Sequence, residues 1–476
     1  MNYRKFDRWA CPMAYIYYKV CAAGLNRQTC LLAAALIALC MAPLGAAASP
    51  GMPGKSGLSV ASGTTEPAPT QPDSLNTYIL SAVNNNPALM SLYRNYEAKV
   101  AGARGAGVLN DPELSVGYFP EKMMHVNGKQ VATFSLMQMF PWFGTLKADR
   151  QQMEYQAEAA YQKFRQQAID LAFDLQRQWY AMLAQREKIR SVEEQRRLLT
   201  DIRKVAVYQY KSAMSGKNAR MSDQLRLEAE DKRLEEQQQS LADQLRLQQQ
   251  QFNLTLHRKA DSPLILPDSL LLRQLPVLNW QQVLADDPGL AQIQAEEKAL
   301  EAQEKRAKSQ GMPMIGVGVE YMLNSKVDMP QMANMNGQDM LMPMLKVTLP
   351  IYRRKTNMAR KSARLLREGA QFSGLRREDD LQSRYLGIEQ QAEDVERKVK
   401  LYDEETRLLD RTLALMRDEY VAGSTPLTDL LQTLREQIDY ALKKAEAYAE
   451  YNTVAAELEQ LAARHDYAKR AEKENH

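Results

Sequence analysis

The sequence predicts a mainly α-helical protein with a membrane β-barrel part, to which each chain contributes four strands. Three observations lead to this fold class. The chain repeats one plan twice, it contains helical stretches far longer than those of globular domains, and each copy holds a pair of segments with strand-like alternation.

The first 48 of the 476 residues predict an export signal. A basic start leads into an apolar run over 30–42, and small residues then offer a cleavage site ending at Ala48. The run is shorter than the roughly 20 residues that a spanning helix needs, although an uncleaved anchor is the alternative. The long basic segment leaves Met13 as an alternative start of translation. Residues 49–72, rich in Ser, Gly, Pro and Thr, predict a flexible tether.

All four cysteines lie in this leader, at positions 11, 21, 30 and 40. The mature chain would therefore have no disulfide framework and no thiolate ligand or nucleophile. Lipidation of Cys40 is disfavoured because Leu39 precedes it, where a lipoprotein signal has a small residue.

The charge balance argues against nucleic-acid binding. Of the 62 basic and 58 acidic residues in the chain, the leader holds five and one, so 57 of each sign follow it. A neutral body lacks the positive surface with which proteins neutralise phosphates, and we expect no nucleic-acid partner.

The duplication appears as matched segments at an almost constant offset. Asn86-Pro87 matches Asp287-Pro288, and 112–117 matches 313–318, both 201 residues apart. The next match, of 139–143 with 348–352, is 209 residues apart, so the second copy has eight extra residues between its apolar segments. We expect a first repeat over 73–262, a linker over 263–278, a second repeat over 279–470 and a tail over 471–476.

Each repeat predicts a helix, two strands, a very long helix, a turn and a closing helix. Residues 145–215 contain neither Gly nor Pro, and a helix of that length would reach roughly 100 Å. Residues 217–262 and the stretch from Leu427 onward also lack both residue types, while 351–422 lacks Pro. Long charged helices of this kind favour coiled-coil packing.

The predicted strands alternate with a period of two. Apolar residues alternate with small or polar ones over 113–118, 315–321 and 344–349, and less regularly over 133–140. Such strands suit a barrel with lipid outside and water within, although a half-buried sheet is also compatible. Because four strands alone would leave unpaired edges in lipid, several copies would have to share one barrel. We predict Phe140, Trp142 and Tyr352 as aromatic anchors at the membrane interface.

Residues 73–470 resemble the TolC-type outer-membrane efflux proteins. Four segments carry the resemblance: Asn-Asn-Pro-Ala-Leu (85–89), Leu-Asn-Asp-Pro-Glu-Leu-Ser-Val-Gly-Tyr (109–118), Val-Thr-Leu-Pro-Ile-Tyr (347–352) and Tyr-Val-Ala-Gly-Ser-Thr-Pro-Leu-Thr-Asp-Leu-Leu (420–431). The resemblance implies a homotrimer with a twelve-stranded barrel in the outer membrane and a helical tunnel in the periplasm. It also implies an adaptor (membrane fusion) protein and an inner-membrane pump as partners.

The resemblance further implies an aperture at the helix turns, closed by polar side chains. Tyr420, Asp429 and Asp223 match this gate, whereas Thr425 stands where the family has an arginine. Asp as a helix cap and Tyr as a packing residue are the alternative interpretations of the three positions.

No catalytic motif and no cofactor site is evident, so we predict no enzyme and no cofactor. Methionines are concentrated, however, with nine between positions 312 and 344 out of 24 in the chain. Thioether sulfur prefers Cu(I)-like ions, so Met329, Met332 and Met335 are candidate metal ligands. Apolar filling is the alternative role for these methionines.

The sequence thus predicts a passive trimeric channel of a tripartite efflux system, with a lean towards copper or silver export. A periplasmic coiled-coil adaptor or structural protein without a pore is the alternative, and the two alternating strand pairs argue against it.

Overall fold

The computed structural model describes residues 75–121, 123–125, 128–212, 221–327 and 336–463, all within one compact unit, Pro69–His476. The first repeat forms α3 (Leu75–Asn85), α4 (Pro87–Gly105), β1 (Glu113–Tyr118), β2 (Met124–His125), β3 (Gly128–Phe140), α5 (Thr145–Ser212) and α6 (Met221–Thr255). The second repeat forms α7 (Trp280–Asp286), α8 (Pro288–Gln310), β4 (Met314–Ser325), β5 (Met340–Thr348), α9 (Arg353–Val421) and α10 (Leu427–Leu461). The predicted mainly helical fold and its duplicated element order are confirmed.

The duplicated Asx-Pro pairs each divide the opening helix of a repeat in two. Pro87 and Pro288 begin α4 and α8 as the first helical residue, where a missing N–H costs nothing. Asn86 Oδ1 accepts a hydrogen bond from the Ala88 N–H at 2.9 Å, and Asp287 Oδ2 accepts one from Leu290 at 2.7 Å. The same local chemistry therefore starts the equivalent helix in both repeats.

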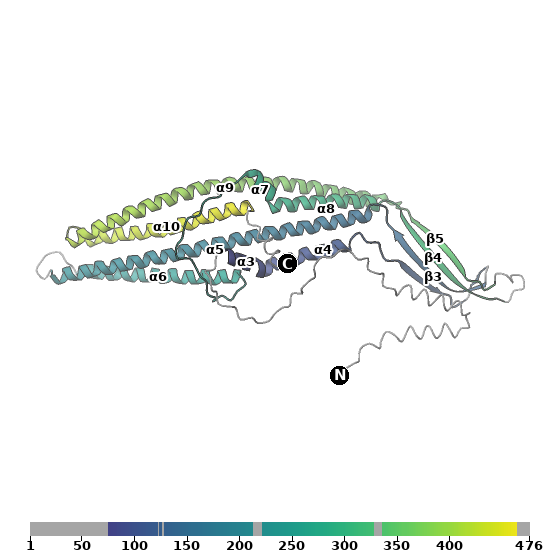
Figure 1. The fold of residues 1–476 in the computed structure, drawn as a ribbon, viewed down its shortest axis with the longest axis horizontal. Helices are drawn as coiled ribbons and strands as arrows, with labels where there is room; N and C mark the ends of the chain where they lie inside the picture. The colour runs from purple at the N-terminus through teal and green to yellow at the C-terminus, as the bar shows by residue number, and fades with distance from the viewer. Residues whose placement is uncertain (1–74, 122, 126–127, 213–220, 328–335, 464–476) are drawn as a thin grey trace, which may run out of the picture. The chain divides into compact units, whose positions relative to one another are not determined.

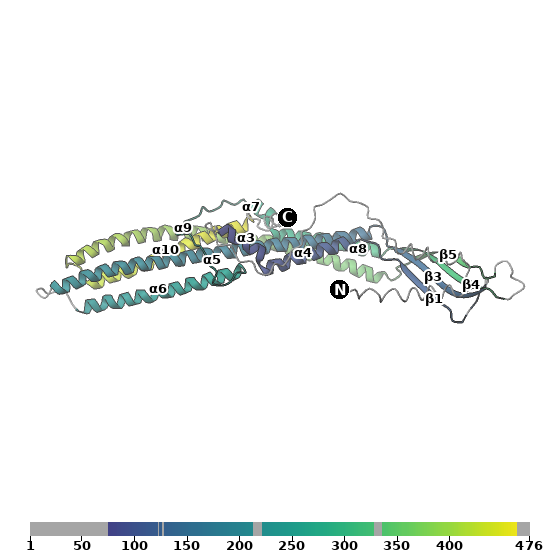
Figure 2. The same cartoon turned by 60° about the horizontal axis from the view of Figure 1, so that its bottom comes forward.

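The predicted long helices are continuous. Helix α5 has 68 residues and α9 has 69, and the three glycines of α9 do not interrupt it. Within this unit, α5 packs on α4, α6, α8 and α10, while α9 packs on α8 and α10 (Figures 1 and 2). Near the strands the helix order is therefore α4–α5–α8–α9, and near the helix turns it is α6–α5–α10–α9.

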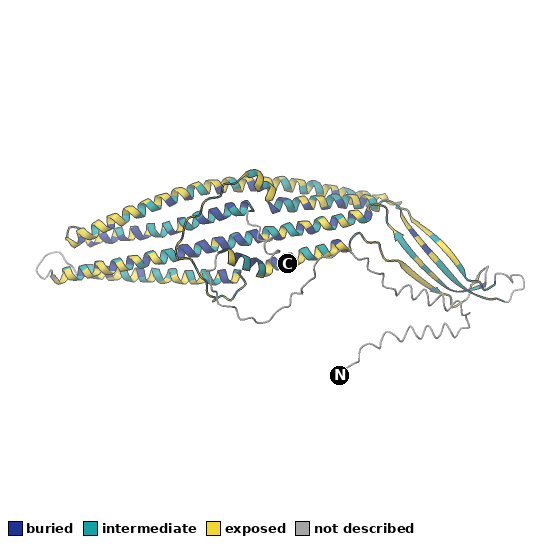
Figure 3. Ribbon diagram, in the orientation of Figure 1, coloured by how far each residue is buried: buried dark blue, intermediate teal, exposed yellow. Residues whose placement is uncertain are grey.

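The buried residues lie mainly where these helices face one another (Figure 3). One cluster joins α3 to the middle of α5 and the end of α6, with Tyr78, Trp179 and Phe252 in mutual ring contact. A second cluster fills the region near the helix turns, and a third packs α9 against α10. None of the described helices combines the length and apolarity needed to cross a lipid bilayer.

The strands form one antiparallel sheet in the order β1-β3-β4-β5, with the short β2 beside β3. The two repeats meet in the middle of this sheet, where β3 pairs with β4 over Lys129–Phe140 and Ile315–Ser325. Strand β3 begins five residues earlier than the predicted segment 133–140. The predicted leader, tether and tail, together with Met329, Met332 and Met335, lie outside the described residues.

Candidate functional site

One face of the sheet is apolar across all four long strands. The register places Leu114, Leu136 and Val319 side by side in one row, and Phe140, Ile315 and Val347 in another. The exposed large side chains of this face, each between 39% and 73% exposed, are Leu114, Val116, Phe134, Leu136, Phe140, Ile315, Val317, Val319, Leu341, Leu345 and Val347. Soluble proteins rarely leave so continuous an apolar surface in water.

The opposite face carries small, polar and charged residues together with methionines. It includes Glu113, Ser115, Gly117, Thr133, Ser135, Gly316, Gly318, Glu320, Lys346 and Thr348. The apolar stretch of β3 from Ala132 to Phe140 covers about 26 Å of strand, comparable with the apolar band of about 25 Å on outer-membrane barrels. The sheet thus has one face suited to lipid and one suited to water.

The predicted interface aromatics lie where the sheet joins the helices. Phe140 ends β3, Trp142 lies in the loop to α5, and Tyr352 immediately precedes α9. They are 41%, 37% and 89% exposed, and Trp142 contacts the 88% exposed Phe143 edge-on at 6.1 Å between ring centroids. This position is compatible with the predicted interface role, which stays a prediction.

At the helix turns, the structure brings two of the three predicted gate residues together. Tyr420 ends α9 and is buried against Leu427, Leu430 and the other residues of the cluster near the turns. Burial raises the pKa of Tyr420, and the negative charge of Asp223 in the first turn of α6 raises it further. Tyr420 and Asp223 therefore lie within electrostatic range of each other, although they belong to different repeats.

The third predicted gate residue is placed differently. Asp429, in the first turn of α10, is exposed, and its Oδ1 accepts a hydrogen bond from the Thr428 hydroxyl at 3.1 Å. Thr425, the position at which the family pattern has arginine, donates from its hydroxyl to Glu419 at 2.6 Å. The side chain of Asp429 thus faces away from the buried Tyr420.

The turn between α9 and α10 is held by a residue that the sequence analysis did not single out. Gln209 on α5 donates from its amide to the carbonyl oxygens of Tyr420 at 3.0 Å and Val421 at 3.2 Å. These carbonyls belong to the last turn of α9 and have no intrahelical donor. Gly423 takes a φ of 80° in this turn, and its N–H donates back to Tyr420. Tyr210 lies 210 residues before Tyr420, close to the offset of the duplication, and so is its counterpart in the first repeat. Gln209 immediately precedes Tyr210, and that adjacency was the available signal.

A buried carboxylate links the two repeats near the same end. Glu230 on α6 is 2% exposed and accepts hydrogen bonds at Oε2 from Arg435 of α10, at 2.7 and 3.0 Å. Its Oε1 accepts from Arg233 Nε at 3.0 Å. Burial alone would raise the pKa of Glu230, but the hydrogen bonds and charges of the two arginines outweigh burial and lower it.

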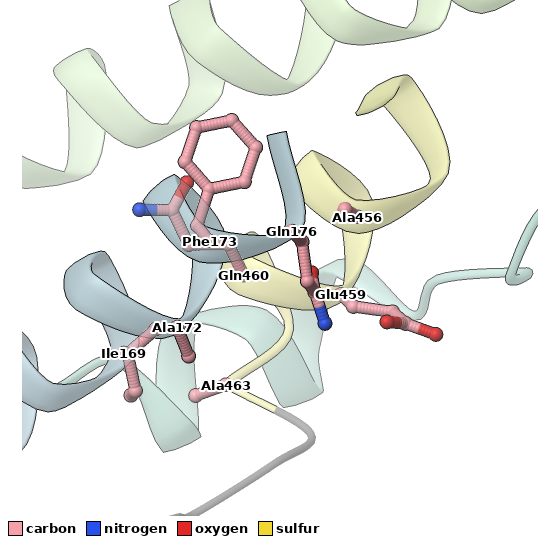
Figure 4. A pocket seen from close by; sticks show the side chains of 8 residues that line it. All are labelled: Ile169, Ala172, Phe173, Gln176, Ala456, Glu459, Gln460 and Ala463. Atoms are coloured by element: carbon pink, nitrogen blue, oxygen red, sulfur yellow. The ribbon is translucent and has the colours of Figure 1, made fainter. Parts of the chain in front are cut away.

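Among the described residues, a surface hollow of about 440 Å³ lies along α6 and is lined mostly by polar side chains, namely Glu236, Gln239, Ser240, Asp243, Gln244 and Leu247. The small cavity in Figure 4, between α5 and the end of α10, has a volume of about 20 Å³, enough for about one water molecule. In the part of the chain that the structure describes, no three His, Cys, Asp or Glu side chains gather to hold a metal ion. The distinctive surfaces are therefore the two-faced sheet and the helix turns.

At the level of sequence, no family model and no curated protein matches the chain. Solved structures do match its fold. The outer membrane protein VceC of Vibrio cholerae aligns over 82% of this chain and 96% of its own, with 12% identity and a TM-score of 0.67. CusC, whose structures describe folding and transmembrane channel formation, aligns over 82% and 91% with 15% identity and a TM-score of 0.67. The open state of the MtrE outer membrane channel of Neisseria gonorrhoeae aligns over 82% and 88%, with 15% identity and a TM-score of 0.61.

The chain therefore has the fold of the TolC-type outer-membrane efflux channels, as its resemblance to them implied. At identities of 12–15% the likeness establishes the fold alone. These neighbours are outer-membrane and channel proteins and not enzymes, which fits the prediction of a non-enzyme. The likeness in fold does not test the lean towards copper or silver export, which stays a prediction.

Proposed function

We propose that this protein is a trimeric outer-membrane channel, a passive duct that carries exported substrate from the periplasm or an inner-membrane pump to the exterior. The observation that carries the proposal is the two-faced sheet with open edges. Its apolar face requires lipid, and its edge strands β1 and β5 require partners, because unpaired backbone groups in lipid cost several kcal/mol each.

Pairing between copies satisfies both requirements. The first repeat supplies β1, α4 and α6 to one edge of the protomer, and the second supplies β5 and α9 to the other. Joining unlike edges head to tail produces a closed ring when the rotation closes. Two copies would give an eight-stranded barrel filled by side chains, whereas three would give twelve strands around a lumen.

Helix α9 carries an apolar stripe that supports this assembly. Met358, Leu365 and Phe372 recur at intervals of seven and are 55%, 55% and 71% exposed. A second run, Leu401, Leu408 and Leu415, has the same spacing and is 50%, 53% and 65% exposed. A heptad pattern on the free flank of a long helix is typical of a coiled-coil seam, and we assign it to the next copy.

In this proposal the helical part lies in the periplasm, and its turns dock an adaptor protein and an inner-membrane pump that supplies the energy. The sequence contains no nucleotide-binding motif that could drive transport itself. The aperture lies at the turns, with Asp429 directed at the neighbouring copies and Tyr420 and Asp223 behind it.

The gate assignment is tested by Asp429→Ala in planar bilayers. Removing an exposed carboxylate that bonds across the aperture should raise the single-channel conductance, whereas Asp439→Ala, which removes an exposed carboxylate of α10 ten residues farther from the turns, should change it little. Equal conductance of the wild type and Asp429→Ala would remove Asp429 from the gate.

The function is tested by fractionating native cells and measuring the mass of the detergent-solubilised protein. We expect an outer-membrane particle of about three protomers that conducts ions when reconstituted. A soluble periplasmic monomer would contradict the duct and favour a coiled-coil adaptor.

A further inference from the structure

The methionines of the three strands β3, β4 and β5 all lie on one face of the sheet. Strands β3, β4 and β5 together contain seven methionines, namely Met137, Met139, Met314, Met322, Met340, Met342 and Met344. The register places every one of them on the face of Glu113, Ser115 and Glu320. The apolar face of these strands contains no methionine and is built mainly from Leu, Val, Ile, Phe, Tyr and Ala, together with Pro343 and the polar Gln138.

The register also brings these methionines together around two glycines and one carboxylate. Met137 and Met344 flank Gly318 on either side, and Met342 is directly opposite Glu320. Directly opposed residues on one face have Cβ atoms about 5 Å apart. Gly318 allows a close approach of the two strands here, because a Cβ atom on it would lie 2.8 Å from the Leu136 carbonyl oxygen and 3.3 Å from Met137 Cα.

The second glycine is covered by a thioether. A Cβ atom built on Gly316 would lie only 2.5 Å from Met139 Sδ, so this sulfur lies over the glycine backbone. Met139 follows Met137 on the same face of β3, and Gly316 precedes Gly318 on the same face of β4. The thioethers of β3 thus extend across β4 towards those of β5.

Apolar filling does not explain this distribution. Methionine fills irregular gaps in buried cores, but this face carries charged and hydroxyl residues and would line water in the proposed barrel. Met342 is 36% exposed in the isolated chain. A filler would be expected among the leucines and valines of the lipid face, where the seven methionines are absent.

We propose that this methionine face binds soft monovalent metal ions, Cu(I) or Ag(I), as cargo passing through the lumen. Its ligands would come from Met137, Met139, Met342 and Met344, with Glu320 supplying negative charge beside them. Thioether sulfur selects such ions over hard cations, and several weak neighbouring sites allow ions both to enter and to leave. The inference rests on the proposed duct, because it places this face towards the lumen.

The test is a silver nitrate titration of the purified detergent-solubilised protein, with bound Ag(I) measured by competition against a soluble thioether chelator. The triple variant Met137→Leu, Met342→Leu and Met344→Leu keeps the apolar volume, a change that proteins tolerate well, but removes three sulfurs. We expect at least ten-fold weaker Ag(I) binding, with unchanged conductance in the absence of silver. The matched control is Met221→Leu, at an exposed methionine at the start of α6, which should bind Ag(I) like the wild type.

A second variant tests the geometry without removing sulfur. Gly316→Ala places a methyl group where Met139 Sδ lies, and the flexible thioether must move away. Weaker Ag(I) binding in this variant, which keeps all its methionines, would show that the position of the thioether groups determines binding. If the triple variant binds Ag(I) as tightly as the wild type, the methionines are fillers and the proposal is wrong.

The two proposals fail in different ways. Normal conductance with unaltered Ag(I) binding in the triple variant overturns the metal site and leaves the duct. Loss of Ag(I) binding in the variant of a protein that never conducts supports the metal site and overturns the duct.

Discussion

At the scale of single residues, Glu230 is the buried carboxylate that joins the first repeat to the second. Its two oxygens are held separately, Oε2 by Arg435 of α10 and Oε1 by Arg233 of α6. A buried carboxylate without its partners would be costly. The contact therefore fixes α6 beside α10 near the turns, where Tyr420 and Asp223 also meet across the repeats.

Arg435→Met should loosen this end of the helices. The change leaves Oε2 of a 2% exposed carboxylate without its donor, which costs about 1–3 kcal/mol. Amide hydrogen exchange in α6 and α10 near residues 230 and 435 should become about five- to one-hundred-fold faster at pH 7. Lys443→Met on the same helix removes a surface ion pair with Asp439 and an exposed contact with the Tyr440 ring, and it should change the exchange little.

The effect of Arg435→Met on amide hydrogen exchange should depend on pH. The folded-state pKa of Glu230 lies below the ordinary value of 4.5. The contribution of the ionised Glu230 carboxylate to folding stability is therefore complete above pH 4.5. That contribution is lost as the pH falls through the folded pKa. After correction for intrinsic exchange rates, the difference between the wild type and Arg435→Met should shrink below pH 4.5. A difference that persists undiminished in acid would show that the charge of Glu230 is not responsible.

At the scale of elements, the sequence determines local features far better than distant contacts. The starts of α4 and α8 were predictable because an Asx residue before a proline combines a cap with a favoured first helical residue. Segment 133–140 was harder to interpret, because Met137 and Met139 share a face with Thr133 and Ser135 and obscure the alternation. The contact of Glu230 with Arg435 was not predictable, because 205 residues separate them on helices full of similar charges.

The sheet faces predict opposite responses to the same substitution. Leu136→Arg places a charge in the middle of the apolar face, at a side chain 48% exposed in the isolated chain, and should cost about 2–4 kcal/mol near the bilayer midplane. Ser135→Arg is the matched control, because the adjacent residue points to the polar face at the same depth. We expect a reduced yield of outer-membrane protein for Leu136→Arg only, measured by quantitative membrane fractionation. Equal yields for both variants would contradict the assignment of the apolar face to lipid.

At the scale of the whole molecule, the duplication explains why one chain has two unlike edges. Each repeat supplies two strands of the sheet and one long helical hairpin, and the repeats join through β3 with β4 and α5 with α8 and α10. The outer flanks that remain are β1, α4 and α6 of the first repeat and β5 and α9 of the second. A ring of copies would repeat the internal junction between these flanks, so the contact between protomers should resemble the contact between repeats.

The stripe on α9 tests this assembly directly. Leu408 and Leu415 are 53% and 65% exposed in the isolated chain, and burying each in a neighbouring copy would contribute about 1.5–3 kcal/mol. The double variant Leu408→Gln and Leu415→Gln should therefore shift detergent-solubilised trimer towards monomer, measured as mass against protein concentration. Its helical circular dichroism should be unchanged, because neither side chain lies in the core of the protomer. The control Arg407→Gln with Arg411→Gln introduces the same residue at exposed positions of the same two turns and should remain trimeric. If the leucine variant also stays trimeric at every concentration, the seam lies elsewhere, and the α6 flank alone would have to account for the contact.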